Sequence, residues 1–441
     1  MAMVVKNNMS AISTLNTLNK NSSALSKSLE KVSSGMKING AADDASGYAI
    51  SERMRVQIRG LDQSNANTQN GNAMMKVAEG AVSSTVDILK TLKEKVINAA
   101  NDTNTDSDRQ TIQKELDQSI DQIDDNANIT YNGKYLVDGS HNNKTTNTTT
   151  ALTNESMDSA TTKETALTAL KNRNGESLNI HSTDNVTISY VHEGKTYSTT
   201  FKVGSESLAT AVAKTAYNGD KSLAGALSFN ESTATSKIGL DGSGNTVYTA
   251  DKGCALTLTA KTTGVAGQIS GFTISITTNK GAINKSANAV LDNFTESIRA
   301  QNESEDNAMV FQVGTKANQA IKVGLTDMRS TALGLKGADG ETLSVSTQVK
   351  ANAAINVLDN AIQKALDQQT TIGSVESRLS YTSSNLTTAS ENVQSSESTI
   401  RDADMAKEMT NYTKNNVLLQ AAQSMLAQAN QSSSSVLSLL Q

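Results

Sequence analysis

The sequence predicts a mainly α-helical protein whose two helical ends flank a smaller inserted α+β region. Residues 1 to about 140, and those from about 301 onward, mix small apolar and polar residues, whereas residues from about 141 to 300 are rich in Thr, Ser, Asn and Gly. Proline is absent from all 441 residues, so the strongest helix breaker is missing. Apolar residues near both ends recur at spacings of three and four, which is typical of packed helices.

Bulk composition restricts the class of protein further. A chain of this length predicts about two to four domains, and hydrophobic and aromatic contents of 37% and 3% argue against one large core. The net charge of −5 does not indicate a nucleic-acid partner. Cys254 is the one cysteine, so no intrachain disulfide can form, and we interpret it as structural rather than reactive. No run reaches the roughly 18 apolar residues of a membrane span.

The N-terminal segment Met1–Lys6 lacks the apolar run of a cleavable signal peptide. A protein of this kind that leaves the cell would need a dedicated export route.

The C-terminal region has the clearest periodicity. Its first seam consists of Val375, Leu379, Thr382, Leu386, Ala389, Val393, Ser396, Ile400 and Ala403. After a phase shift the seam resumes with Tyr412, Asn416, Leu419, Ala422, Leu426, Ala429, Ser433, Val436 and Leu440. We therefore expect helix over most of residues 374–441, with a length on the order of 100 Å.

The N-terminal region has three comparable seams. The first consists of Ile12, Leu15, Leu18, Leu25, Leu29, Val32 and Met36. The second consists of Met75, Ala78, Val82, Leu89, Leu92, Val96 and Ala99, and the third of Ile112, Leu116, Ile120, Ile123 and Ala127. Small or polar residues hold many seam positions at both ends of the chain, so we expect the ends to fold marginally in isolation and to become stable when many copies pack together.

The middle region predicts strands. Val186–Val191 and Tyr197–Val203 alternate with period two around a Glu193-Gly194 turn, which indicates a β-hairpin. Ala255–Ala260 and Phe272–Ile276 repeat the pattern, and 205–216 is a plausible short helix. These elements define the α+β insert.

Two blocks of motifs resemble the bacterial flagellin family. Near the N-terminus they include LEKVSSGMKIN at 29–39, ADDASGYAIS at 42–51 and QIRGL at 57–61. Near the C-terminus they include NLTTASEN at 385–392, IRDADMA at 400–406 and MLAQANQ at 425–431. The resemblance covers both ends and stops in the middle region.

The resemblance implies a filament subunit that is not an enzyme and needs no cofactor. It implies a terminal coiled-coil domain of residues 1–45 and 400–441, an outer-tube domain with a hairpin from 46–140 and 301–399, and a solvent-facing insert at 141–300. It also implies export in an unfolded state, a C-terminal chaperone, assembly at the distal tip beneath a cap protein, and contact with hook–filament junction proteins. Within the terminal domain we expect subunits to pack through the seams above, with Leu418, Leu419, Leu437, Leu439 and Leu440 innermost.

The family is also sensed by a Toll-like receptor of animal hosts through the first long outer helix. Where the usual signature carries Arg and Leu, this chain has Thr91 and Lys95, whereas Glu94 and Glu115 match. We therefore expect weaker receptor signalling than from strongly stimulating flagellins.

Several motifs have simpler interpretations. Asp43-Asp44 is interpreted as a helix N-cap rather than a metal pair. Asp241–Asn245 begins like a calcium loop, but Thr246 and Lys252 stand where Gly and Glu are required, which favours a glycine-rich turn. His141, His181 and His192 lack ligand spacing and are expected at the solvated surface.

Three alternatives stay open. The protein could be a hook–filament junction protein of the same superfamily. The insert could carry an enzyme, although no metal or nucleophile constellation is visible. The Thr- and Ser-rich insert could be O-glycosylated or simply a soluble surface.

Overall fold

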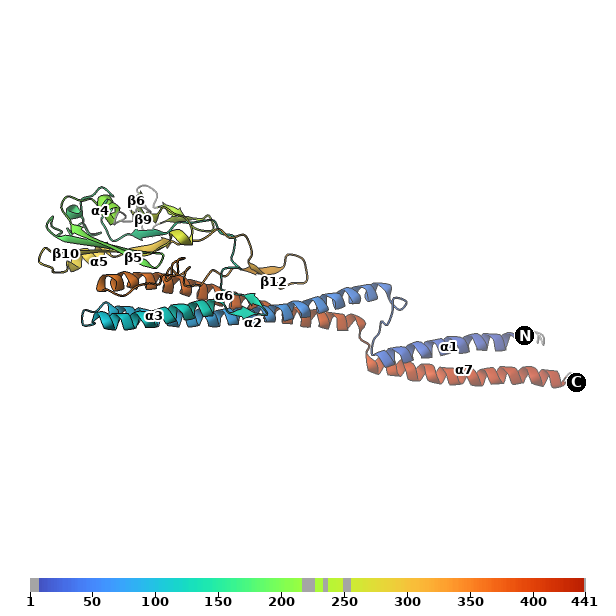
Figure 1. The fold of residues 1–441 in the computed structure, drawn as a ribbon. Coiled ribbons are helices and arrows are strands. Elements are labelled where there is room, and N and C mark those ends of the chain that lie inside the picture. Colours follow the sequence, from blue (N-terminus) through green and yellow to red (C-terminus); the bar gives the residue numbers. More distant parts are fainter. Residues whose placement is uncertain (1–7, 216–226, 233–236, 249–254, 440–441) are drawn as a thin grey trace. The chain divides into compact units, whose positions relative to one another are not determined.

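The structure is a computed structural model that describes residues 8–215, 227–232, 237–248 and 255–439 (Figure 1). Its contacts define two compact units. The first comprises Met1–Thr68, Gln312–Gln319 and Tyr381–Gln441, and the second comprises Gln69–Phe311 and Ala320–Ser380. Helices α2 (Ala45–Ala99) and α6 (Gln348–Arg401) contribute to both units. The three-part division expected from the resemblance therefore stays a prediction.

The first unit contains two antiparallel helix pairs. Helix α1 (Met9–Ser34) pairs with α7 (Met405–Leu439), as Figure 1 shows. The start of α2 pairs with the end of α6. Helix α1 ends at Gly35, whose left-handed φ of 70° allows its N–H to bond back to the Lys31 carbonyl.

The C-terminal region forms two helices where the periodicity suggested one extended helix. Helix α6 already begins at Gln348, and it ends at Arg401. Asp404 then caps α7, because its Oδ1 accepts bonds from the backbone N–H groups of Ala406 at 3.0 Å and Lys407 at 3.2 Å. The interruption falls at the phase shift between the two C-terminal seams.

The helices of the second unit confirm two predicted seams. Helix α3 (Asp106–Ala127) starts with a capping box between Thr105 and Asp108. Almost all of the predicted positions are buried, namely Met75, Ala78, Val82, Leu89, Leu92, Val96, Ala99, Leu116, Ile120, Ile123 and Ala127. Ile112 is half-buried.

The insert contains two antiparallel sheets. One has the order β10-β4-β5, formed by β10 (Ile269–Thr277), β4 (Asn185–His192) and β5 (Lys195–Lys202). The other has the order β11-β3-β9-β6, formed by β11 (Thr295–Ile298), β3 (Ala151–Asn154), β9 (Ala255–Ala260) and β6 (Leu227–Ser232). Side chains from both sheets and from α5 (Lys285–Leu291) share one buried core.

The predicted hairpin is confirmed in register. Val186 pairs with Phe201 and Tyr190 with Tyr197. Glu193 and Gly194 have φ values of 49° and 75°, which is the backbone that a tight two-residue hairpin turn requires. At Gly194 an added Cβ would also lie 2.4 Å from the Glu341 carbonyl, so the turn fits closely against a neighbouring loop.

The predicted short helix begins later than expected. Helix α4 spans Leu208–Thr215, and the Ser207 hydroxyl accepts from the Thr210 N–H at its start. Ala216 and Cys254 lie outside the described residues.

Three small hairpins and two 3-10 turns complete the described elements. The hairpins are β1 (Thr130–Tyr131) with β2 (Lys134–Tyr135), β7 (Lys237–Leu240) with β8 (Thr246–Tyr248), and β12 (Met309–Gln312) with β13 (Ala320–Val323). The 3-10 turns are η1 (Leu167–Ala169) and η2 (Val265–Gly267). The turn between β7 and β8 is the predicted turn, in which Asp241 accepts from the backbone of Ser243 and Asn245.

Candidate assembly surface

Polar side chains hold α1 and α7 together. Asn8 Nδ2 donates to the Ala429 carbonyl and Asn21 Nδ2 to the Leu418 carbonyl, both at 3.2 Å. From the other helix, Asn415 Nδ2 donates to the Ser28 hydroxyl at 3.0 Å. These bonds set the antiparallel register. A seam built on Asn and Ser contributes less burial than one built on Leu.

Very little of this helix pair is buried. Among the described side chains, Ser28 is the one buried residue of α1 and Ala422 the one buried residue of α7. Eight of the predicted seam residues on these two helices are half-buried, namely Leu18, Leu25, Val32, Tyr412, Asn416, Leu419, Leu426 and Ala429. The pair therefore lacks a core of large apolar side chains.

Other predicted seam residues stay exposed in the single chain. Leu29 is 52% exposed, and Ile12, Leu15 and Leu418 are also exposed. They are joined by residues that the sequence analysis did not select, namely Met9, Met405, Met409, Val417 and Met425. Several exposed apolar residues thus lie on both helices. The long apolar Met side chains in these two segments are the sequence feature that could have identified these additional exposed residues.

Five predicted residues near the C-terminus cannot be placed by their side chains. The described side chains of α7 end at Ser432, so those of Ser433, Val436, Leu437 and Leu439 lie beyond them, and Leu440 lies outside the described residues.

The junction between α6 and α7 is organised by Arg401. This side chain is 7% exposed and pairs with Glu52 at 2.7 Å. Its guanidinium lies over the Tyr48 ring, 5.6 Å from the centroid. The bond from Arg401 lowers the pKa of the Glu52 carboxyl. The sequence analysis quoted Arg401 as a motif residue but assigned it no role.

The predicted capping role near the start of α2 is confirmed for Asp44. Its Oδ1 accepts from the backbone N–H groups of Ser46 and Gly47, both at 3.0 Å. At Gly47 an added Cβ would lie 2.6 Å from Asp44 Oδ2 and 2.7 Å from the end of the Ile38 side chain, so a larger residue would require these side chains to shift.

The α2–α6 pair within the first unit is also largely polar. Ser383 Oγ donates to Asn65 at 2.7 Å and Ser390 Oγ to Asp62 at 2.9 Å. Of the predicted seam, Leu386 is buried, whereas Val393 and Ile400 are half-buried.

The predicted receptor-facing residues lie on α2 and α3 of the second unit. Thr91, Glu94 and Glu115 are exposed, and Lys95 is half-buried. Lys95 Nζ forms an ion pair with Glu115 at 2.9 Å. Glu115, which matches the family signature, is therefore paired with Lys95, which departs from it.

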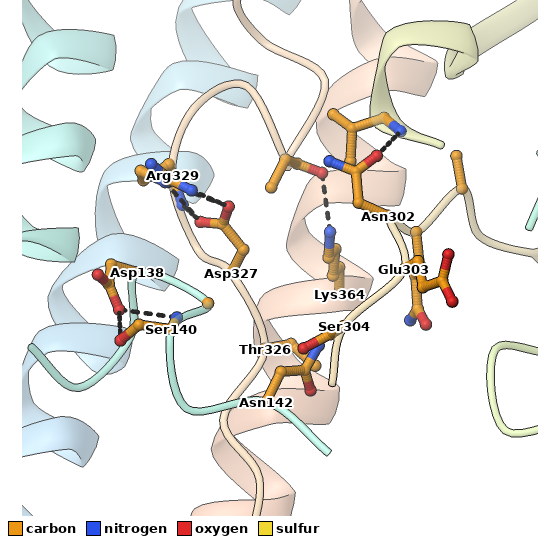
Figure 2. A pocket seen from close by; sticks show the side chains of 15 residues that line it. Asp138, Ser140, Asn142, Asn302, Glu303, Ser304, Thr326, Asp327, Arg329 and Lys364 are labelled. Atoms are coloured by element: carbon orange, nitrogen blue, oxygen red, sulfur yellow. Dashed lines mark hydrogen bonds and ion pairs between the residues drawn. The ribbon is translucent and has the colours of Figure 1, made fainter. Parts of the chain in front are cut away.

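A polar cavity of about 340 Å³ lies in the second unit (Figure 2). It is formed by the loop after β2, the chain that leaves β11, the segment before α6, and α6 itself. Arg329 pairs with Asp327 at 2.7 Å in its wall, and Lys364 donates to the Ala332 carbonyl at 2.8 Å. The sequence analysis did not select this cavity, because its walls come together only in the folded chain.

The histidines agree only in part with the expected solvated positions. His181 is exposed, but His141 and His192 are half-buried. Burial lowers the pKa of His192, since β4 and β10 pair at this position. In the part of the chain that the structure describes, no three His, Cys, Asp or Glu residues are grouped to hold a metal ion. Likewise, none of its described helices is long and apolar enough to cross a membrane.

Comparison with known proteins defines the class. Residues 5–142 match the bacterial flagellin N-terminal helical region, and residues 355–440 match the bacterial flagellin C-terminal helical region. A flagellin from Clostridium tyrobutyricum is 34% identical over 97% of this chain and 99% of its own length. A flagellin from Bacillus subtilis strain 168 is 30% identical over 99% and 100%.

Solved structures are more distant. The flagellar hook-associated protein-3 of Legionella pneumophila has 16% identity and a TM-score of 0.33, covering 78% of this chain and 97% of its own. FliC from Burkholderia pseudomallei has 16% identity and a TM-score of 0.25, covering 70% and 99%. With TM-scores this low, the sequence matches carry the assignment.

The chain is a structural filament protein, not an enzyme, with long terminal helices and an inserted α+β region. It belongs to the bacterial flagellin family. It is therefore a structural subunit of the flagellar filament, which is part of the extracellular flagellum and serves motility. The flagellins that match nearly the whole chain favour the filament subunit over the junction-protein alternative.

Proposed function

We propose that this subunit is exported unfolded and polymerises at the distal tip of the filament by coupled folding of its terminal helices. One observation carries the proposal, namely the exposed apolar side chains on α1 and α7 beside a seam that buries almost nothing. Full burial of one such side chain contributes roughly 1.5–3 kcal/mol. Contacts between copies would bury several of them and offset the cost of ordering the helices.

The contact between copies would be heterologous. A different surface of each copy meets its neighbour, and because such a contact does not close on itself, an open helical polymer results. We propose that the exposed residues Ile12, Leu15, Leu29 and Leu418 face neighbouring copies, whereas the half-buried residues Leu18, Leu25 and Leu426 join α1 to α7.

A matched pair of variants tests this division. Ile12→Gln, Leu15→Gln and Leu29→Gln together remove three exposed apolar side chains from α1. We expect the monomer to keep its helix content and to form no filaments, as judged by electron microscopy and sedimentation. The control combines Ser13→Gln, Asn19→Gln and Lys27→Gln, which change three exposed polar positions of the same helix. Normal filaments from the first variant would contradict the proposal.

The proposal extends to the partners that such a route requires. These are an export chaperone bound to the C-terminal region, a cap protein at the growing tip, and junction proteins at the base. A chaperone that covers α7 would shield Val417 and Met425, which are 59% and 63% exposed.

We also propose weak recognition by the Toll-like receptor of animal hosts. Thr91 supplies no guanidinium, and Lys95 holds Glu115 in an ion pair. A reporter-cell assay would show reduced potency, and Thr91→Arg with Lys95→Leu would raise it. Full potency of the unaltered protein would contradict this part of the proposal.

A further inference from the structure

Lys364 is a buried lysine on the wall of the polar cavity. The residue lies on α6 and is 9% exposed. Its Nζ donates one hydrogen bond, to the Ala332 carbonyl at 2.8 Å. Within the described ranges, no carboxylate forms an ion pair with this group. An ammonium has three N–H donors, so two of them find no protein acceptor in the described structure.

The carboxylate that acts on Lys364 most strongly is already engaged elsewhere. Burial lowers the pKa of Lys364, and the charge of Glu296 opposes that effect. The Glu296 side chain is 6% exposed and is bound by Arg299 at 3.3 Å. Because a buried charge without a direct partner is costly, a further anion beside Lys364 would be stabilised.

Amide donors face the same cavity. Asn302 Oδ1 accepts from the Val265 N–H at 2.9 Å, which leaves its Nδ2 as a donor. Asn142 Oδ1 likewise accepts from the Asn143 N–H at 2.9 Å. Figure 2 shows Asn302, Asn142 and Lys364 on the wall of this one cavity. Planar donors of this kind suit the oxygens of a carboxylate or phosphate.

The carboxylates of the wall are largely satisfied. Asp327 receives a bidentate bond from Arg329, at 2.7 Å for the shorter contact. Asp138 accepts from the Ser140 hydroxyl at 2.6 Å. Glu303 is exposed and is the remaining acidic residue of the lining. The wall therefore presents one buried donor group, on Lys364, beside the amide donors of half-buried Asn142 and exposed Asn302. Of its three carboxylates, Asp327 is paired with a guanidinium.

We propose that this cavity binds a small solute through an oxyanion, a carboxylate or a phosphate, held by Lys364 Nζ and Asn302 Nδ2. Its volume of about 340 Å³ lies near the lower end of the range of small-molecule sites, about 300–1,000 Å³. The cavity can hold a molecule of the size of a sugar acid. All of the lining residues belong to the second unit, whereas α1 and α7 belong to the first.

The test is calorimetric titration of the full chain with glucuronate, glucose and inorganic phosphate. Glucuronate and glucose share a ring and differ in charge. We expect glucuronate, phosphate or both to bind, with glucose at least tenfold weaker. Lys364→Met removes the ammonium while keeping an apolar stem, and it should abolish binding. Asn302→Asp keeps the oxygen that accepts from Val265 but replaces the donor, and it should weaken binding at least tenfold. Lys280→Met, at an exposed turn, is the control.

A spectroscopic readout separates binding from a purely structural role. In carbon-13 NMR the pKa of Lys364 should rise when the anion is added, and that of Lys280 should not. Equal binding of glucose, no binding of either anion, or unchanged affinity in both cavity variants would overturn the proposal. If Lys364→Met does not fold, as judged by circular dichroism, Asn302→Asp and the NMR titration decide.

Discussion

At the scale of single residues, the molecule relies on polar side chains to fix register. Asn8, Asn21 and Asn415 each bond across the α1–α7 pair. Arg401 joins the chain segments at the end of α6 through Glu52 and Tyr48. Hydrogen bonds contribute modest net stability but define one geometry. Such a pair can have a specific register without a large core.

The pH dependence of stability is predicted at Asp292. Desolvation raises the pKa of this carboxyl to about 6, although Asn356 and the Ile274 N–H bond to it. An unfolded Asp has a pKa near about 3.9, so the folded state takes up the proton first as the pH falls. The charged form destabilises the fold above pH ~6, and this destabilisation is relieved between pH ~6 and ~4.

Asp292→Asn should therefore raise the thermal midpoint of the second unit at pH 8 and change it little at pH 4. Asparagine keeps one acceptor oxygen and carries no charge at either pH. Calorimetric melting at several pH values checks this, with Asp339→Asn, at an exposed turn, as the control. An equal effect of Asp292→Asn at both pH values would show that its carboxyl does not titrate differently in the folded chain.

At the scale of elements, the sequence pattern predicted best those helices and hairpins whose structure is set by their own residues. The β4–β5 hairpin follows from alternation and a Glu-Gly turn, and it appears in register. The buried seams of α2 and α3 follow from heptad spacing. The break between α6 and α7 was visible as a phase shift, and two bonds set it: the local cap by Asp404 and a tertiary bond from the Ala403 N–H to the Gly35 carbonyl.

The remaining elements could be identified only in the folded chain. Strand β3 is four residues long and lies beside Thr-rich sequence, so its pairing with β9 and β11 has little local signal. The cavity around Lys364 brings together residues from 138 to 364. Exposed and half-buried positions of α1 also could not be separated, because Ile12 and Leu18 belong to one apolar repeat. Which of these positions is exposed depends on the side of α1 against which α7 packs.

The start of α3 offers a test of a single element. Thr105 Oγ1 accepts from the Asp108 N–H, and Asp108 accepts from the Thr105 N–H at 2.9 Å. Loss of an N-cap costs about 0.5–2 kcal/mol. Thr105→Ala should lower the unfolding free energy of the second unit by about 1 kcal/mol in denaturant titration, and Thr105→Ser should restore it. Thr111→Ala, on an exposed position of the same helix, serves as the control. No loss in Thr105→Ala would show that the cap is dispensable.

At the scale of the whole molecule, stability is distributed unevenly between the units. The second unit contains the insert core, with Tyr190 and Phe272 fully buried, and the helical seams of α2 and α3. The α1–α7 pair of the first unit buries little beyond Ser28 and Ala422. Regions with few buried apolar contacts open at low free energy. A subunit that stays loosely folded at its ends and well folded elsewhere suits assembly by addition.

Hydrogen exchange of the backbone amides of α1 and α7, compared between the dilute monomer and the filament, tests the coupling of folding to assembly most directly. We expect low protection in the monomer and protection at least a hundredfold higher in the filament, while α2 and α3 amides near Leu89 and Ile120 stay protected in both. Strong protection of α1 and α7 in the dilute monomer would contradict the proposal that neighbouring copies order these helices.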